Sequence, residues 1–169
     1  SNEVSKNIRF NRSTACPIRL LTAPHGSYAF AGAQLLTDGL VGEDTNFHSG
    51  SWMGFVGNNL EAVIDLGKAV SISSLKLNTC VEKGAWIFDA RAIEIWGSTD
   101  GTNFQPLGKK DIPAMKESDR NAIYSHALTF TPQTVRYAKV IVKSEPFIPE
   151  WHGGKGRPGF VFVDEIEIN

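Results

Sequence analysis

The run LEAVIDLG, residues 60–67, alternates apolar and polar side chains with the two-residue period of a β-strand that buries one face. The positions expected to face the core are Leu60, Ala62, Ile64 and Leu66. The same period recurs in SSLKLNTCV (73–81), RAIEIWGS (91–98), AIYSHALTF (122–130), RYAKVIVKS (136–144) and FVFVDEIEI (160–168), with a shorter run, IRLLTAP, at 18–24. Turn sequences such as DLGK, STDG and FTPQ separate these runs. Seven or eight short strands with regular turns predict an all-β sandwich or jelly roll.

Two local signals add detail to this fold. STDG at 98–101 predicts a hairpin turn in which Gly101 takes a positive φ angle. FAGAQLLTDG at 30–39 is the one stretch that predicts a helix, one or two turns long and ending at Gly39.

The length of the chain indicates how many domains it forms, and its charge argues against one class of function. A chain of 169 residues suits one domain with a full core. It carries 17 basic and 18 acidic residues, and a nucleic-acid-binding domain would normally show a clustered basic excess. Ser1 and Asn2 are interpreted as a cloning remnant, so we expect a piece of a longer protein, with residues 1–14 as an N-terminal extension and 15–169 as one module.

The two cysteines, Cys16 and Cys80, leave the redox state open. A disulfide between them is one reading, but two cysteines do not make a disulfide scaffold. Cys80 lies in an alternating run, where a small buried apolar side chain fits. Free, buried thiols are the favoured interpretation.

Catalytic motifs are missing from the sequence. It has no nucleophile elbow, no P-loop, no HExxH and no metal-spaced Cys/His set. Asp164 and Glu165 are adjacent on a predicted strand, so their side chains should point to opposite faces and cannot flank one glycosidic bond. We therefore expect a binding domain and not an enzyme.

Three tryptophans lie in loops where a buried core would not require them. They occur in GSWMGFVG (50–57), EKGAWIF (82–88) and PEWHGGKGRPG (149–159). Flat rings on loops at one end of a β scaffold can stack on the apolar face of a sugar, while neighbouring polar groups bind its hydroxyls. The candidate sugar-binding residues are His48, Trp52, Glu82, Trp86, Trp151, His152 and Arg157.

Each of these candidates has a purely structural alternative. Trp52 could close one end of the sandwich, and His48 could be a structural histidine. Trp151 and His152 could pack against a neighbouring domain. The sequence leaves these alternatives open.

An acidic, glycine-containing loop follows the predicted helix. LLTDGLVGEDTNF, residues 35–47, places Asp38, Glu43, Asp44 and Thr45 close together in the chain. Ca²⁺ takes six to eight oxygen ligands, and such a loop supplies several. The alternative is a solvated acidic turn with Asp38 capping it locally.

Several short motifs occur here in a familiar order: LTDG at 36–39, AVIDLG at 62–67, GSTDGTNF at 97–104 and FVDEIEI at 162–168. Together they resemble the discoidin domain, also called the coagulation factor 5/8 type C domain, which in bacteria overlaps the family 32 carbohydrate-binding modules. GLVGEDTNFHSGSWMGFVG, GAWIF and PEWHGGKG are similar to modules at the C-terminus of bacterial β-N-acetylhexosaminidases. The resemblance implies a non-catalytic, galactose-binding-domain-like jelly roll of eight strands.

The resemblance also implies a structural calcium ion. Asp38 matches the loop aspartate of the family, Thr45 the loop threonine and Glu165 the acid of the last strand. Main-chain oxygens near Leu35, Leu40 and Asp164 would complete the ligand set. Leu40 stands where the family often has Asn, so only a carbonyl is offered there.

The function that the resemblance implies is an accessory module of a secreted, periplasmic or cell-surface bacterial glycoside hydrolase. The parent would be of the β-hexosaminidase (chitobiase) or β-galactosidase type, and the module would bind terminal galactose or N-acetylhexosamine. Its expected partners are a glycan and the catalytic domain of the parent enzyme. A structural spacer and a protein- or phospholipid-binding discoidin domain are the alternatives, but a net charge of −1 disfavours an anionic membrane.

Overall fold

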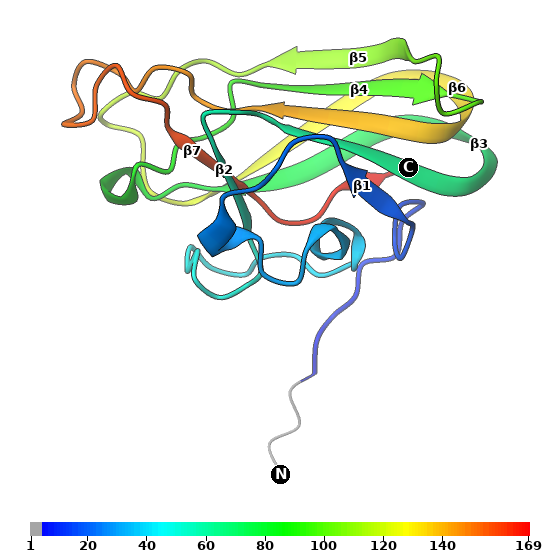
Figure 1. Ribbon diagram of the computed structural model, residues 1–169, viewed down its shortest axis with the longest axis horizontal. Coiled ribbons are helices and arrows are strands. Elements are labelled where there is room, and N and C mark those ends of the chain that lie inside the picture. Colours follow the sequence, from blue (N-terminus) through cyan, green and yellow to red (C-terminus); the bar gives the residue numbers. More distant parts are fainter. Residues whose placement is uncertain (1–4) are drawn as a thin grey trace.

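The computed structural model describes residues 5–169 and shows eight antiparallel strands that form a curled sheet closed into a sandwich (Figure 1). The hydrogen-bonded order is β2-β7-β3-β6-β4-β5, and β1 and β8 both pair with β3. The strands are β1 Ile18–Leu20, β2 Met53–Val56, β3 Leu60–Cys80, β4 Ala92–Ser98, β5 Gln105–Asp111, β6 Ile123–Lys143, β7 Phe160–Val163 and β8 Glu167–Ile168. The all-β, eight-stranded prediction is confirmed.

Strands β3 and β6 are longer than the sequence pattern predicted, because each joins two of the expected runs. The turn signals DLGK and FTPQ do not end a strand. Across the β3–β6 pair, DLGK faces residues 135–137 and FTPQ faces residues 72–74. The register shifts at both places, between Asp65 and Val70 and between Ile72 and Ser74. Irregularities of this kind bend and twist a strand without breaking its pairing. Both strands therefore pass from one layer of the sandwich to the other.

The predicted helix is shorter and tighter than expected. Residues 33–37 form the 3₁₀ helix η2 (Ala33–Thr37), and two more single turns occur, η1 (Gly26–Tyr28) and η3 (Lys83–Ala85). Gly39 follows η2 with φ of 81°, which is the left-handed conformation that its position after a helix suggested. Gly101 has φ of 77° in the β4–β5 turn, so that prediction is also confirmed.

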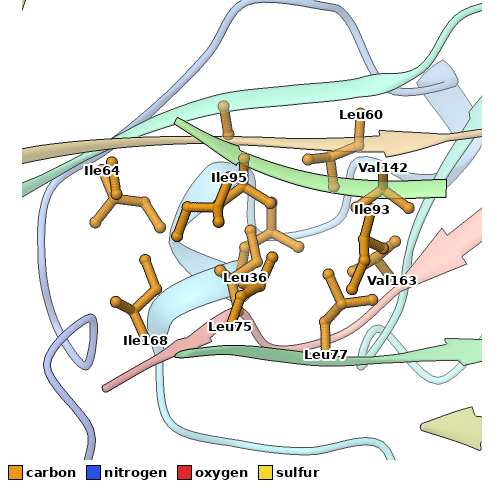
Figure 2. Packing of buried hydrophobic residues seen from close by; sticks show 14 of the residues in the cluster. Leu36, Leu60, Ile64, Leu75, Leu77, Ile93, Ile95, Val142, Val163 and Ile168 are labelled. Carbon is orange, nitrogen blue, oxygen red and sulfur yellow. The ribbon is translucent and has the colours of Figure 1, made fainter. Parts of the chain in front are cut away.

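The main core lies between the layers and is filled by the inward faces of the strands (Figure 2). Ile64, Ile95 and Leu75 come from strands on both sides, and Leu36 of η2 closes the core from one edge. The four positions of LEAVIDLG that were expected to face the core, Leu60, Ala62, Ile64 and Leu66, are all buried, as the alternation predicted. Since β3 and β6 contribute to both sides, the core holds the two layers in one fixed arrangement.

Residues 9–14 pack against the domain, although we expected them to belong to an extension covering residues 1–14. The Arg9 amide donates to the Gly39 carbonyl, and the Arg12 amide donates to the Ile168 carbonyl, both at 2.9 Å. Ser13 is completely buried, and its hydroxyl lies 2.5 Å from the Ile166 carbonyl. Ser1 and Asn2, which were interpreted as a cloning remnant, lie outside the described residues.

The two cysteines are unpaired: Cys80 is buried and Cys16 half-buried. Burial raises the pKa of the Cys80 thiol to about 12, so this thiol is an inert core side chain. No helix within residues 5–169 is long and apolar enough to cross a membrane.

We expect Ser13→Ala to destabilise the domain by about 1–3 kcal/mol, because it removes the buried hydroxyl that donates to the Ile166 carbonyl and accepts from the Ile168 amide. The Ile168 amide donates to this hydroxyl at 3.1 Å. Urea unfolding followed by circular dichroism measures the change. Ser71→Ala, at an exposed position of β3, is the matched control and should stay within about 0.5 kcal/mol of the wild type. Equal stability of the two variants would contradict the packing of this segment.

Candidate functional site

One end of the sandwich gathers two loops that carry tryptophan. The first, residues 82–88, includes η3 and folds back on itself through backbone hydrogen bonds between Glu82 and Ile87. The second, residues 145–159, leads into β7 and is drawn in orange at the left of Figure 1. Phe160 and Trp86 join them, since the Phe160 amide donates to the Trp86 carbonyl at 2.8 Å. We call residues 82–88 and 145–159 together the loop end.

His152 links the two loops of the loop end. Its Nε2 lies 2.8 Å from the Lys83 carbonyl, and its Nδ1 accepts a hydrogen bond from the Gly154 amide at 2.9 Å. A carbonyl can only accept, so these partners specify the neutral tautomer with the proton on Nε2. His152 is therefore a crosslink between the loops, and both of its ring nitrogens are in use.

Trp86 lies half-buried across the backbone of the second loop. Its φ of 65° is a left-handed conformation, and its amide donates to the Lys83 carbonyl. A Cβ atom added to Gly154 would lie 2.9 Å from Cε2 of this indole, so the close approach requires glycine at 154. The Arg157 guanidinium lies 5.9 Å from the ring centroid, within the range of a cation–π contact.

Trp151 is also half-buried, and its indole N–H is already occupied. It donates to the Met115 carbonyl at 3.3 Å, while the Lys83 ammonium lies 5.5 Å from the ring centroid. Both tryptophans pack on a small apolar cluster formed by Val81, Phe88, Met115 and Ile148. The loop end thus presents two partly exposed rings, each with a cation beside it. Such a surface can stack on a sugar ring and donate to its hydroxyls.

Not all of the expected sugar-binding residues meet at the loop end. Glu82, Trp86, Trp151, His152 and Arg157 do, from the two loops described above. His48 and Trp52 belong instead to a second aromatic cluster built around Tyr28, Phe47 and Phe162. His48 is exposed, and its ring centroid lies 4.1 Å from that of Phe47.

Trp52 is completely buried, which corrects the expectation that it contacts a ligand. Its indole N–H donates to the Asp44 carbonyl at 3.0 Å, and its ring lies directly against Gly42. The loop at 42–52 wraps around this ring. The alternative reading, in which Trp52 closes one end of the sandwich, describes its place in the structure.

Two features near these clusters escaped the sequence analysis. Phe30 is 43% exposed beside Tyr28, and the aromatic stretch YAF at 28–30 between Gly26 and Gly32 was the signal for it. The position of Lys83 over Trp151 had no signal, because the two residues are far apart in the sequence.

A candidate cation site lies where the loop after η2 meets the end of the chain. Glu165 is 1% exposed, and neither of its side-chain oxygens has a hydrogen-bond partner within residues 5–169. Burial, together with the nearby negative charges of Asp38 and Asp164, raises the pKa of Glu165 to about 9. An unpartnered buried carboxylate is costly, and a bound cation would remove that cost.

Asp164 is buried beside Glu165 but is fully committed within the protein. Its carboxylate accepts hydrogen bonds from the Gly42 amide at 2.9 Å and from the Asn78 side chain at 3.1 Å. Burial is the main cause of the raised pKa of Asp164, and these donors oppose it. Its contribution to a cation could only be the main-chain oxygen, as the family resemblance implied. The two acids lie in the break between β7 and β8, not within one strand as predicted.

The other expected ligands are only partly brought together. Leu35 and Leu40 flank Asp38 on the same loop, and the Leu40 amide donates to the Asp38 carboxylate at 2.8 Å. Thr45 lies further along, where its carbonyl accepts from the Cys80 thiol. No group of three or more His, Cys, Asp or Glu side chains within residues 5–169 is arranged around a metal. A cation at Asp38 and Glu165 would therefore need hydroxyl or main-chain oxygens as well, which suits Ca²⁺.

Comparison with known families gives a match over most of the chain. The model of the F5/8 type C domain matches residues 22–159. A comparison with curated protein sequences gave no match.

Several solved structures share the fold at low sequence identity. Chitosan-binding module 1 from a chitosanase/glucanase of Paenibacillus sp. IK-5 is 17% identical, with a TM-score of 0.58 over 95% of this chain and 99% of that one. A Clostridium perfringens module in complex with GalNAc-β-1,3-galactose is 16% identical, with a TM-score of 0.56 over 89% and 94%. A Streptococcus pneumoniae fucose-binding module is 19% identical, with a TM-score of 0.55 over 94% of both chains.

The raised pKa of Glu165 predicts how the calcium-free domain responds to pH. In the unfolded chain this carboxyl ionises near its ordinary pKa of 4.5, whereas the folded protein keeps the proton up to about pH 9. The unfolded state therefore loses protons first, and stability should fall as pH rises from about 5 to about 9, by on the order of a few kcal/mol.

Urea unfolding in EDTA across this pH range measures the effect. Glu165→Gln cannot ionise and should lack this part of the pH dependence. If wild type and Glu165→Gln give parallel curves, the Glu165 carboxyl is not held neutral in the folded domain.

Proposed function

The chain belongs to the F5/8 type C domain family, and we propose that it binds the terminal galactose or N-acetylhexosamine of a glycan without catalysing a reaction. The observation that carries this proposal is the loop end, where Trp86 and Trp151 expose part of their rings beside Arg157 and Lys83. Solved structures of this fold include modules that bind fucose and GalNAc-β-1,3-galactose, which supports a saccharide ligand.

The chemistry of the loop end suits a sugar with one apolar face. The C–H groups of that face would pack on an indole, and the charged neighbours would bind hydroxyls at its edge. Arg157 is a donor, and the Glu82 carboxylate is an acceptor. The Lys83 ammonium donates to the Glu117 and Asp119 carbonyls, which leaves one N–H for a ligand. His152 has both ring nitrogens occupied, so its role is to position the loops.

The parent protein in this proposal is a secreted, periplasmic or cell-surface bacterial glycoside hydrolase of the β-hexosaminidase or β-galactosidase type. The similar Paenibacillus module derives from a chitosanase/glucanase, which supports attachment to a carbohydrate-active enzyme. The module would keep the catalytic domain near its glycan.

A second candidate function is a spacer that packs on the catalytic domain. Phe147 favours it, because this side chain is 71% exposed on the same loop that carries Trp151. An exposed phenylalanine beside two half-buried tryptophans could be covered by a neighbouring domain.

We also propose that one Ca²⁺ ion binds at Asp38 and Glu165 and ties the loop after η2 to the end of the chain. The two unpartnered buried oxygens of Glu165 carry this proposal. The ion would supply positive charge for two carboxylates that otherwise repel each other. Thr45 and the main-chain oxygens of Leu35, Leu40 and Asp164 are the further candidates for ligands.

The sugar proposal predicts that loss of either loop-end ring abolishes detectable binding. Removing a stacking ring should cost about 1–3 kcal/mol, and a millimolar starting affinity is only about −4 kcal/mol. The measurement is calorimetric titration of wild type, Trp86→Ala and Trp151→Ala with a panel of galactose and N-acetylhexosamine glycosides. Trp96→Ala, on the face of β4, is the matched control and should bind as the wild type does.

Two results would contradict the sugar proposal. One is wild-type affinity in both loop-end variants. The other is a wild type that binds no sugar of the panel while the intact parent enzyme protects Trp86 and Trp151 from solvent. The latter result would establish the spacer.

The calcium proposal predicts that Ca²⁺ raises the melting temperature and that EDTA reverses the rise. At 100 to 1,000 times the dissociation constant, the gain in stability is about 3–4 kcal/mol. Asp38→Asn should lose this response. Asp44→Asn is the matched control, because Asp44 lies exposed on the same loop and also accepts a hydrogen bond from an amide two residues ahead. An unchanged response in Asp38→Asn would refute the site.

A further inference from the structure

A hollow of about 310 Å³ opens on the outer face of the sheet, away from the loop end. Its walls come from β1, β3, β6 and the β4–β5 turn. They are formed by Pro17, Ile18, Arg19, Val63, Asp65, Asp100, Gly101 and Tyr137. In Figure 1 the β4–β5 turn lies at the right end of the sandwich, whereas residues 145–157 lie at the left. The hollow is therefore separate from the loop end.

The sheet register places four of the lining residues in two cross-strand pairs. Arg19 pairs with Val63, and two residues further along β3, Asp65 pairs with Tyr137. Positions 63 and 65 lie on the face opposite Ala62 and Ile64, which fill the core. The floor of the hollow is thus built from paired strands, and the β4–β5 turn closes one side of it.

Two carboxylates in the hollow are held in place and ionised. Asp65 accepts two hydrogen bonds from the Arg136 guanidinium, at 2.9 and 3.0 Å, and this contact lowers the pKa of Asp65. Asp100 accepts from the backbone amides of Asn103 and Thr102, both at 2.8 Å, and these bonds lower the pKa of Asp100 well below its usual value. Unlike the buried Asp164, Asp65 is half-buried and Asp100 is exposed, and the Oδ2 atom of each accepts only one hydrogen bond, so that atom can accept a second one from a ligand.

Tyr137 offers its hydroxyl and not the face of its ring. A Cβ atom added to Gly101 would lie 3.3 Å from this ring, and the Arg136 guanidinium lies 5.0 Å from the ring centroid. Within residues 5–169, neither the Tyr137 hydroxyl nor the exposed Arg19 guanidinium has a hydrogen-bond partner in the protein. The hollow therefore holds fixed acceptors together with uncommitted donors.

We propose that this hollow is a second saccharide-binding site, which takes one uncharged polyhydroxylated ring. The charges of Asp65, Asp100, Arg19 and Arg136 sum to zero, so the hollow carries no net charge that would favour an anion or a cation over an uncharged ligand. Hydroxyl groups both donate and accept, and neighbouring hydroxyls match the two oxygens of a carboxylate and the fork of a guanidinium. Val63, Ile18 and Pro17 supply an apolar patch for the C–H side of the ring. The volume is at the lower end of the roughly 300–1,000 Å³ of small-ligand sites, which suits a single ring.

The other ligand classes fit this wall chemistry less well. A carboxylate or phosphate would meet two ionised aspartates. An organic ammonium ion would meet Arg19 and would find the Tyr137 ring already covered by Arg136 and Gly101. With a saccharide at each end, one module could hold two units of the same glycan, and the second contact would gain from the first through a high effective concentration.

The test is a titration of the ¹⁵N-labelled domain with methyl glycosides of galactose, glucose, N-acetylglucosamine and N-acetylgalactosamine, followed by NMR. A ligand in the hollow should shift the amide signals of Arg19, Val63 and Gly101 in a saturable manner. Arg19→Ala should weaken this binding about tenfold or more, because it removes a charged donor, and Tyr137→Phe should weaken it about two- to tenfold. Lys110→Ala, which removes an exposed positive charge from β5, should leave it unchanged.

The outcomes separate this site from the loop end. Shifts at the loop-end amides with none at Arg19, Val63 and Gly101 would overturn the second site and leave the proposed function standing. Shifts at Arg19, Val63 and Gly101 that persist in Trp151→Ala would support the second site, even if the loop end binds nothing. Unchanged affinity in both Arg19→Ala and Tyr137→Phe would overturn it. So would binding of methylammonium at the hollow with no binding of any glycoside.

Discussion

The pairing of β3 with β6 is the interaction on which the rest of this domain depends. Each strand has 21 residues and runs through both layers, and their shared irregularities bend them together. Strands β1, β7 and β8 pair with β3, and β4 pairs with β6. Because one bent ribbon serves both layers, the core between them forms only if its register is correct. A slip of one residue would turn the buried faces of both layers toward solvent.

This ribbon also decides where function can lie. One of its ends, where Cys80 pairs with Ile123, is followed by residues 82–88, and these meet the segment that leads into β7. The hydrogen bond from His152 to the Lys83 carbonyl and the contact of Trp86 with Gly154 hold these loops together. Loops that carry binding residues gain precision when rigid strands fix both of their ends. The half-buried tryptophans therefore both support the loop end and offer it a binding surface.

Carboxylates in this domain fall into two kinds: those that accept hydrogen bonds from the protein and those that do not. Asp65, Asp100 and Asp164 accept hydrogen bonds from the protein itself. Glu165 is as deeply buried as Asp164 but has no such donors within residues 5–169. Groups of the first kind need no outside partner to be stable, whereas the second kind is costly to ionise until a cation or a proton is supplied. This contrast, and not the number of acids in the loop, singles out Glu165 as the carboxylate that lacks a partner in the described part of the chain.

The sequence by itself determined the fold class and the family. Period-two alternation and the order of short motifs are properties of the chain that can be read without knowing which residues meet in space. The sequence also placed Gly101 in a left-handed turn and Ile64 and Leu66 in the core. Only the tertiary structure decided that DLGK and FTPQ lie within continuous strands. Glycine and proline are favoured both where a strand bends and where it ends, so the sequence does not distinguish the two cases. The tertiary structure also separated buried Trp52 from half-exposed Trp86 and Trp151, because burial depends on which loops wrap around each ring. The hollow between Arg19 and Asp100 likewise arises from strand pairing between residues far apart in the chain. A local sequence pattern does not show which distant residues pair.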